Sequence, residues 1–129
     1  MTKGSIKAIP GMLIIMLLPT IAVAQGHFDY RNATPEEIAK YQTDWMKKEI
    51  SLDSATVSAI YTINLKYAKM NHEIMQSDEP GEDKFSKFRA NNDEKDKELQ
   101  KILTAEQFTL YQQKQEERRQ RMREQRNNE

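Results

Sequence analysis

The chain has 129 residues, and its formal charge is zero because 20 Lys and Arg balance 20 Asp and Glu. A balance this even gives no general attraction to nucleic acid or to an anionic membrane. The absence of Cys excludes a disulfide framework, a thiolate nucleophile and Cys-based metal sites. The length allows one domain.

Residues 1–24 have the three parts of a secretory signal. Lys3 and Lys7 form a basic start, residues 12–18 are an unbroken apolar run, and small residues lead up to Ala24. The alternative is an uncleaved anchor, but Pro19 ends the run well short of the ~20 apolar residues that a span needs. We therefore predict cleavage after Ala24, export to the periplasm and no membrane span in the mature protein.

Residues 25–33 show no sustained apolar period and are expected to form a mobile arm. After cleavage, Gln25-Gly26-His27 would offer an amine, two amides and an imidazole, a set that binds Cu(II) or Ni(II) in a square plane. A terminal Gln can also cyclise and lose its amine, which leaves an ordinary polar arm as the alternative. We assign no metal residue and no cofactor.

The first helix is expected over residues 34–50. Thr34 can cap it, Pro35 suits the first helical position, and Glu37 can complete a capping box. Residues 34–115 should form one helical domain.

The second helix is expected over residues 54–76, with Asp53 as its N-cap and Leu52 packed back onto the first turns. Asn64 and Asn71 lie seven residues apart within its apolar stripe. They either fix the pairing with a neighbouring helix, as buried Asn does in coiled coils, or lie at a solvated rim.

A turn at residues 77–81 separates this helix from a third one at 82–102, so the pair should form an antiparallel hairpin. Residues 91–98 in the middle of the third helix are wholly polar, and we expect that they are not deeply buried.

The last helix begins at Leu103-Thr104-Ala105-Glu106-Gln107, where Thr104 caps, Gln107 closes the box and Leu103 packs on the following turn. Residues 116–129 are rich in Arg and almost free of apolar residues, which predicts a basic, solvated helical tail. Clustered Arg also suits nucleic acid, but interleaved Glu and the predicted export argue against that partner.

Leu, Ile, Val and Phe make up only about 15% of the residues after Ala24. So thin a core favours an elongated all-α shape that a second copy completes.

The start of the last helix resembles the LTxxQ signature of the Spy/CpxP family of small periplasmic all-helical proteins. Leu52 and Asp53 stand where a first copy of that signature would lie, although Thr56 replaces its Gln. The resemblance implies a cradle-shaped homodimer of antiparallel helical hairpins. It also implies an ATP-independent chaperone for unfolded or misfolded clients or, alternatively, an envelope-stress regulator or a metal-responsive sensor.

The sequence contains no catalytic constellation, because His27 and His72 lie apart from any nucleophile or orienting group, and we predict no enzyme. The candidate client-binding residues are flexible or aromatic side chains near the hairpin turn, namely Met70, Ile74, Met75, Phe85 and Phe88. The alternative is that these residues form the core of a dimer.

Overall fold

A computed structural model of the chain describes residues 28–128, which form four α-helices and no strand. The helices are α1 (Pro35–Glu49), α2 (Ser54–Gln76), α3 (Gly81–Ile102) and α4 (Ala105–Asn127). The predicted all-α class is confirmed. The predicted signal peptide and the first three residues of the predicted arm lie outside the described residues.

Local capping sets where three of the four helices begin. Thr34 and Glu37 form the predicted capping box, in which the Glu37 carboxylate accepts from Thr34 N at 2.8 Å. Asp53 Oδ1 accepts from Thr56 N at 2.7 Å, and α4 begins with a second complete capping box. Each side chain satisfies a backbone N–H that the helix itself leaves free.

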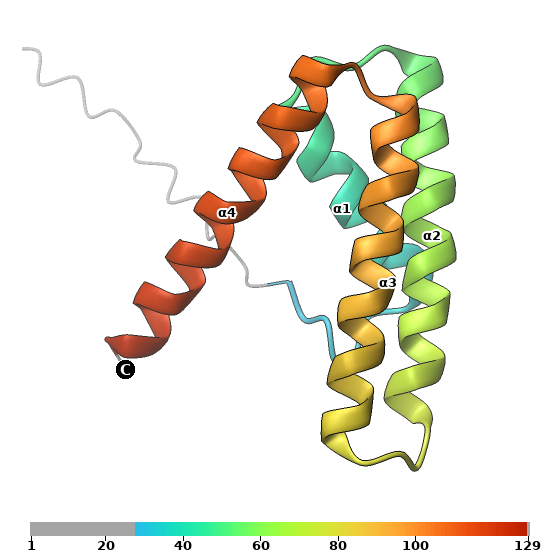
Figure 1. Cartoon of the computed structure of the whole chain (residues 1–129), viewed down its shortest axis with the longest axis vertical. Helices are drawn as coiled ribbons and strands as arrows, with labels where there is room; N and C mark the ends of the chain where they lie inside the picture. Colours follow the sequence, from blue (N-terminus) through green and yellow to red (C-terminus); the bar gives the residue numbers. More distant parts are fainter. Residues whose placement is uncertain (1–27, 129) are drawn as a thin grey trace, which may run out of the picture.

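The helices make two limbs that meet at one end (Figure 1). α2 and α3 lie side by side and run in opposite directions, joined by a short turn at residues 77–80. α1 packs mainly on α2, and α4 leans away from α3 so that its second half projects from the other helices. The concave side of the molecule therefore lies between α3 and α4.

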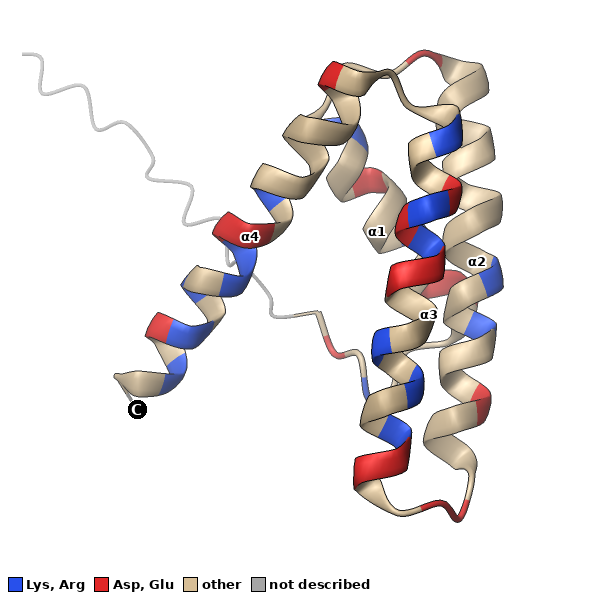
Figure 2. Ribbon diagram, viewed as in Figure 1, with Lys and Arg blue, Asp and Glu red and all other residues tan. Residues whose placement is uncertain are grey.

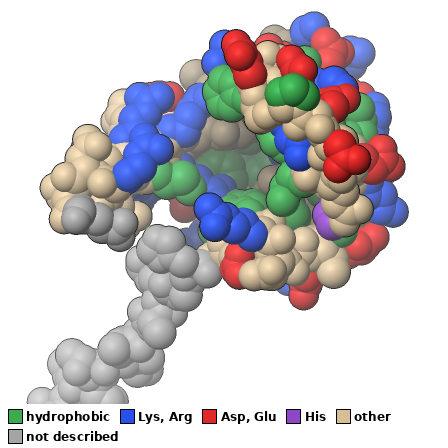
Figure 3. All heavy atoms as spheres, turned by 90° about the horizontal axis from the view of Figure 1, so that it is seen from below, with side chains coloured by type: hydrophobic (Ala, Val, Ile, Leu, Met, Phe, Trp, Pro, Cys, Tyr) green, Lys and Arg blue, Asp and Glu red, His purple; other side chains and the backbone are tan. Residues whose placement is uncertain are grey.

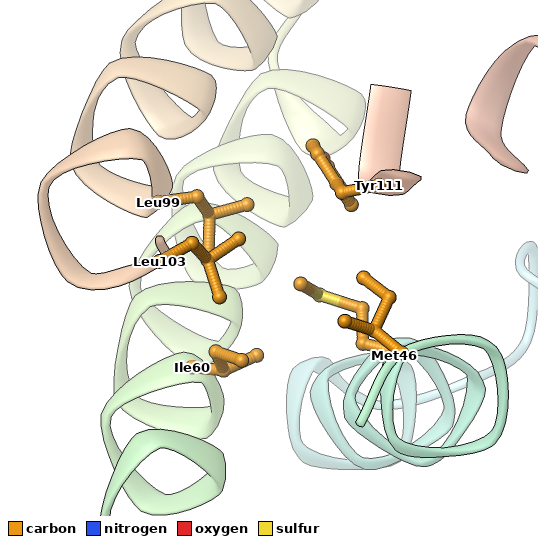
Figure 4. Packing of buried hydrophobic residues seen from close by; sticks show 6 residues of the cluster. Met46, Ile60, Leu99, Leu103 and Tyr111 are labelled. Atoms are coloured by element: carbon orange, nitrogen blue, oxygen red, sulfur yellow. The ribbon is translucent and has the colours of Figure 1, made fainter. Parts of the chain in front are cut away.

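The core lies where the four helices meet, at the end opposite the 77–80 turn. Figure 4 shows side chains from all four helices and their junctions pointing toward one another, and the buried cluster is Met46, Ile50, Ile60, Leu99, Leu103 and Tyr111. Toward the turn, no apolar residue of α2 beyond Ala68 is fully buried. Leu52 and Phe108 are half-buried against the cluster, so the apolar residues that flank both capping motifs anchor them to the core.

Both asparagines within the apolar stripe of α2 join neighbouring helices. Asn64 is 0% exposed, and its Nδ2 donates to Thr43 Oγ1 of α1 at 3.0 Å. Asn71 Oδ1 accepts from Asn91 Nδ2 of α3 at 2.8 Å. These contacts favour the pairing role over the solvated rim.

Candidate functional site

An open groove occupies the concave side of the molecule. It holds a cavity of about 520 Å³ lined mainly by α3 and α4, to which α1 also contributes. Figure 3 shows this hollow from below, with hydrophobic side chains at its bottom and Lys and Arg side chains at its rim. The groove is therefore amphipathic rather than uniformly polar or apolar.

The apolar part of the groove consists mainly of aromatic side chains from three helices. Trp45 of α1, Phe85 and Phe88 of α3 and Tyr111 of α4 all line it. Phe85 is 60% exposed, an unusual position for a Phe ring unless a partner covers it. Aromatic rings bury large areas and tolerate varied neighbours, so these rings can receive apolar segments of different sequence.

The polar part of the groove is mostly cationic. Two acidic residues, Asp93 and Asp96, face five basic ones, which are Arg89, Lys95, Arg118, Arg119 and Arg123. Figure 2 shows how the basic residues concentrate along the second half of α4. The chain is neutral as a whole, yet this surface carries a positive excess that can attract acidic groups.

Arg118 connects α4 to α1 and to the segment just before α1. Its guanidinium donates to Tyr30 Oη at 2.6 Å and lies 5.3 Å from the Tyr41 ring centroid and 5.5 Å from that of Trp45. Burial raises the pKa of Tyr30 above its usual range, and the neighbouring Arg118 opposes that rise. The arrangement combines a charge-assisted hydrogen bond with two cation–π contacts.

Tyr30 belongs to an aromatic cluster outside the main core. Phe28 stacks on Tyr41 with ring centroids 4.2 Å apart, and Tyr30 meets both rings edge to face. Two residues of the expected mobile arm, Phe28 and Tyr30, thus pack against α1, and Tyr30 also bonds to α4.

Arg118 also departs from the expectation for residues 116–129. We expected a solvated tail, but Arg118 is half-buried and bound to three aromatic residues, and Arg119 and Arg123 line the groove. The remaining basic residues of this segment, Arg121 and Arg126, are exposed as expected.

The polar middle of α3 turns part of one face inward. Lys95 is half-buried and its Nζ donates to Gln42 Oε1 of α1 at 2.9 Å, while Asp96 Oδ1 accepts from Tyr111 Oη at 2.8 Å. Burial lowers the pKa of Lys95 to about 8, which Asp96 opposes and Arg118 reinforces. None of residues 91–98 is fully buried, so the expectation that they stay out of deep burial holds, although Lys95 and Asp96 face inward. Polar partners on other helices make their burial possible.

Asn64 lines the floor of the groove with one polar atom unused. Its Nδ2 is bonded to Thr43, which itself donates to the Ala39 carbonyl at 2.7 Å, so the amide orientation is fixed. The buried Asn64 Oδ1 has no partner among the described residues. A water molecule or a donor from a bound segment would satisfy it.

The structure divides the five predicted client-binding residues between two regions. Phe85 and Phe88 line the groove, and Met75 shares an adjoining cavity with Phe88. Met70 and Ile74 instead line a separate cavity of about 400 Å³ between α2 and α3. The reason is helical phase, since residues four apart share a face whereas Met70 and Met75 point in different directions.

The sequence motif at the start of α4 has a further contact that local pattern alone does not reveal. Gln107 N donates to Thr104 Oγ1 at 3.2 Å, and Thr104 N donates to Gln107 Oε1 at 3.0 Å. Gln107 Nε2 also donates to the Ser51 carbonyl at 2.9 Å, which ties α4 to the loop between α1 and α2. Thr56 stands at the matching position of α2 and has no side-chain amide with which to donate such a bond.

Within residues 28–128, no three His, Asp or Glu side chains converge as a metal site would require. The candidate Cu(II) or Ni(II) ligands at Gln25-Gly26-His27 lie outside that range. None of the four described helices is long and apolar enough to cross a bilayer.

The fold and the groove define an all-α protein with an open amphipathic concave surface. The model of a family described as a domain of unknown function (DUF4890) matches residues 24–111, and the chain belongs to this family. No curated protein and no solved structure shows significant similarity to the chain.

Proposed function

We propose that this protein is an exported, ATP-independent chaperone-like protein that binds unfolded or aggregation-prone clients in the bacterial envelope. The groove would be the client-binding surface. The observation that carries the proposal is the aromatic lining of the groove, in which Phe85 is 60% exposed, beside a cationic rim.

Two physical features support binding of varied clients rather than of one fixed ligand. The groove is open, so an extended segment can enter and leave without a lid. Its chemistry is of two general kinds, aromatic contact and positive charge, and neither requires a particular client sequence. Exposed apolar surface of this kind is typical of interaction sites.

We further propose a cradle-shaped homodimer of antiparallel helical hairpins, as the resemblance to the Spy/CpxP family implies. The core supports this assembly because along α2 it reaches no further toward the turn than Ala68, which leaves Met70 and Met75 exposed near the turn. A second copy covering part of that surface would lengthen the concave face.

The test is suppression of light scattering by several unrelated aggregating substrates. The chaperone hypothesis predicts broad protection that Phe85→Ser reduces and that the double variant Phe85→Ser with Phe88→Ser reduces further, because both remove aromatic area from the groove. The matched control is the double variant Met70→Ser with Ile74→Ser. It also removes apolar area near the hairpin turn, but from residues that do not line the groove.

Circular dichroism would establish that each variant keeps its helices, and the exposed Phe85 is the position least coupled to folding. Equal loss in both double variants would contradict a groove-specific site. Protection of a single substrate would favour the regulator hypothesis, and association that requires added Cu(II) or Zn(II) would favour the metal sensor.

A further inference from the structure

A second, smaller cavity adjoins the groove. Its volume is about 160 Å³, and it lies among α1, α2, α3 and the segment that carries Tyr30. Apolar and aromatic side chains form much of its wall, including Tyr30, Ile38, Tyr67 and Phe88. Four residues line both this cavity and the groove, so the two spaces meet at them: Gln42, Phe88, Asn92 and Lys95.

The cation at this junction has no anionic partner. The Lys95 ammonium donates to the neutral amide of Gln42, and among the described residues no carboxylate oxygen lies within 4.0 Å of it. The neighbouring Asp96 carboxylate already accepts from Tyr111. By contrast Lys97, two residues further along the same helix and on a different face, is exposed and pairs with Glu94 at 2.6 Å.

The surroundings of Lys95 increase the need for an anion. Burial lowers the pKa of Lys95 to about 8, and the nearby Arg118 adds positive charge, so the group remains mostly protonated at pH 7 but is poorly stabilised. A half-buried cation of this kind gains from a carboxylate that forms a charge-assisted hydrogen bond.

The size and lining of the cavity limit the rest of the ligand. A cavity of about 150 Å³ holds a single benzene ring, so the space beside Lys95 accommodates one ring and excludes a large ligand. The rings of Tyr30, Tyr67 and Phe88 favour an aromatic body through offset or edge-to-face contact.

We propose that this cavity binds a small aromatic monocarboxylate, with its carboxylate on Lys95 and its ring among Tyr30, Ile38 and Phe88. The cavity shares Phe88 and Lys95 with the proposed client-binding groove, but the proposal does not rest on client binding. The amides of Gln42 and Asn92, which also line the cavity, can donate to the second carboxylate oxygen.

Titration of the purified protein with benzoate, followed by calorimetry and by amide chemical shifts, tests the proposal. Benzamide is the matched neutral probe, because it has the same ring and nearly the same shape without the charge. We expect benzoate to bind at least about tenfold more tightly than benzamide, with shifts at residues that line the cavity. This comparison needs no mutation and is therefore independent of any folding defect.

Two variants then locate the charge. Lys95→Met keeps the apolar stem of the side chain. It should weaken benzoate binding by about tenfold and leave the affinity for benzamide unchanged. Lys97→Met removes an exposed, paired Lys from the same helix and should leave both affinities unchanged. The proposal is overturned if benzoate does not bind, if it binds no better than benzamide, or if the two Lys variants behave alike.

Discussion

Replacing Arg118 by Met should destabilise the protein by about 2–3 kcal/mol. A hydrogen bond to a charged group contributes about 1.5–3 kcal/mol, and a partly exposed cation–π contact about 0.5–1 kcal/mol. Arg118 makes one such hydrogen bond, to Tyr30, and two such contacts, to Tyr41 and Trp45. Because the side chain is half-exposed and the contacts share one group, the total lies well below the sum of the upper values.

Urea unfolding followed by fluorescence measures this loss directly, since Trp45 is the single Trp and lies under the guanidinium. Arg119→Met is the matched control, because the adjacent Arg119 is exposed and pairs with Glu116 at 3.1 Å on the surface of the same helix. We expect the control to change stability by less than about 0.5 kcal/mol.

A double-mutant cycle with Tyr30→Phe separates the hydrogen bond from the ring contacts. The cycle should give a coupling of about 1 kcal/mol between Tyr30 and Arg118, because the phenol oxygen is the acceptor that Phe lacks. Equal effects of Arg118→Met and Arg119→Met, with no coupling to Tyr30, would refute the assignment of Arg118 as the residue that fastens α4.

The remaining predictions concern the helix start, a buried charge and assembly. Thr104→Ala should cost about 1 kcal/mol through loss of the cap and Leu103→Ala about 2–4 kcal/mol through loss of buried volume, and unchanged thermal midpoints in both would contradict the role of this motif. Lys95 has a folded pKa lowered to about 8, so the unfolded chain binds more protons above that pH and stability should rise between pH 8 and 10. Urea titrations should show a smaller rise in Lys95→Met, and an identical slope would disprove the contribution. Sedimentation at micromolar concentration should show a dimer. A stable, fully helical monomer would contradict this prediction.

The helix boundaries were predictable because their signals are local. Thr34, Asp53 and Thr104 each bond to a backbone N–H within the next three residues, and such contacts depend on little else in the fold. The turn at residues 77–80 was equally clear from its composition. These elements account for most of the all-α architecture.

The groove was only partly predictable because its contacts join distant parts of the chain. Phe85 and Phe88 were expected to bind clients on chemical grounds, but Arg118 was assigned to a solvated tail because its partners Tyr30, Tyr41 and Trp45 lie far away in the sequence. No periodicity in α4 signals that contact.

Two other differences between the predicted and the observed positions of side chains have distinct origins. The separation of Met70 and Ile74 from Met75 follows from 100° per residue and could have been seen from helical phase. The inward position of Lys95 could not be seen from the sequence, because it depends on Gln42 of another helix accepting a hydrogen bond from its ammonium group.

Site-specific photo-crosslinking to an unfolded client tests the central claim most directly. A photoreactive amino acid at Phe85 reports on the groove, and the same group at Met70 reports on an exposed apolar position outside it. We predict strong crosslinks to the unfolded client from position 85 and weak ones from position 70. The same client in its folded state should give no crosslinks from either position. Equal crosslinking from both positions, or crosslinking from position 70 alone, would contradict the groove as the client-binding surface.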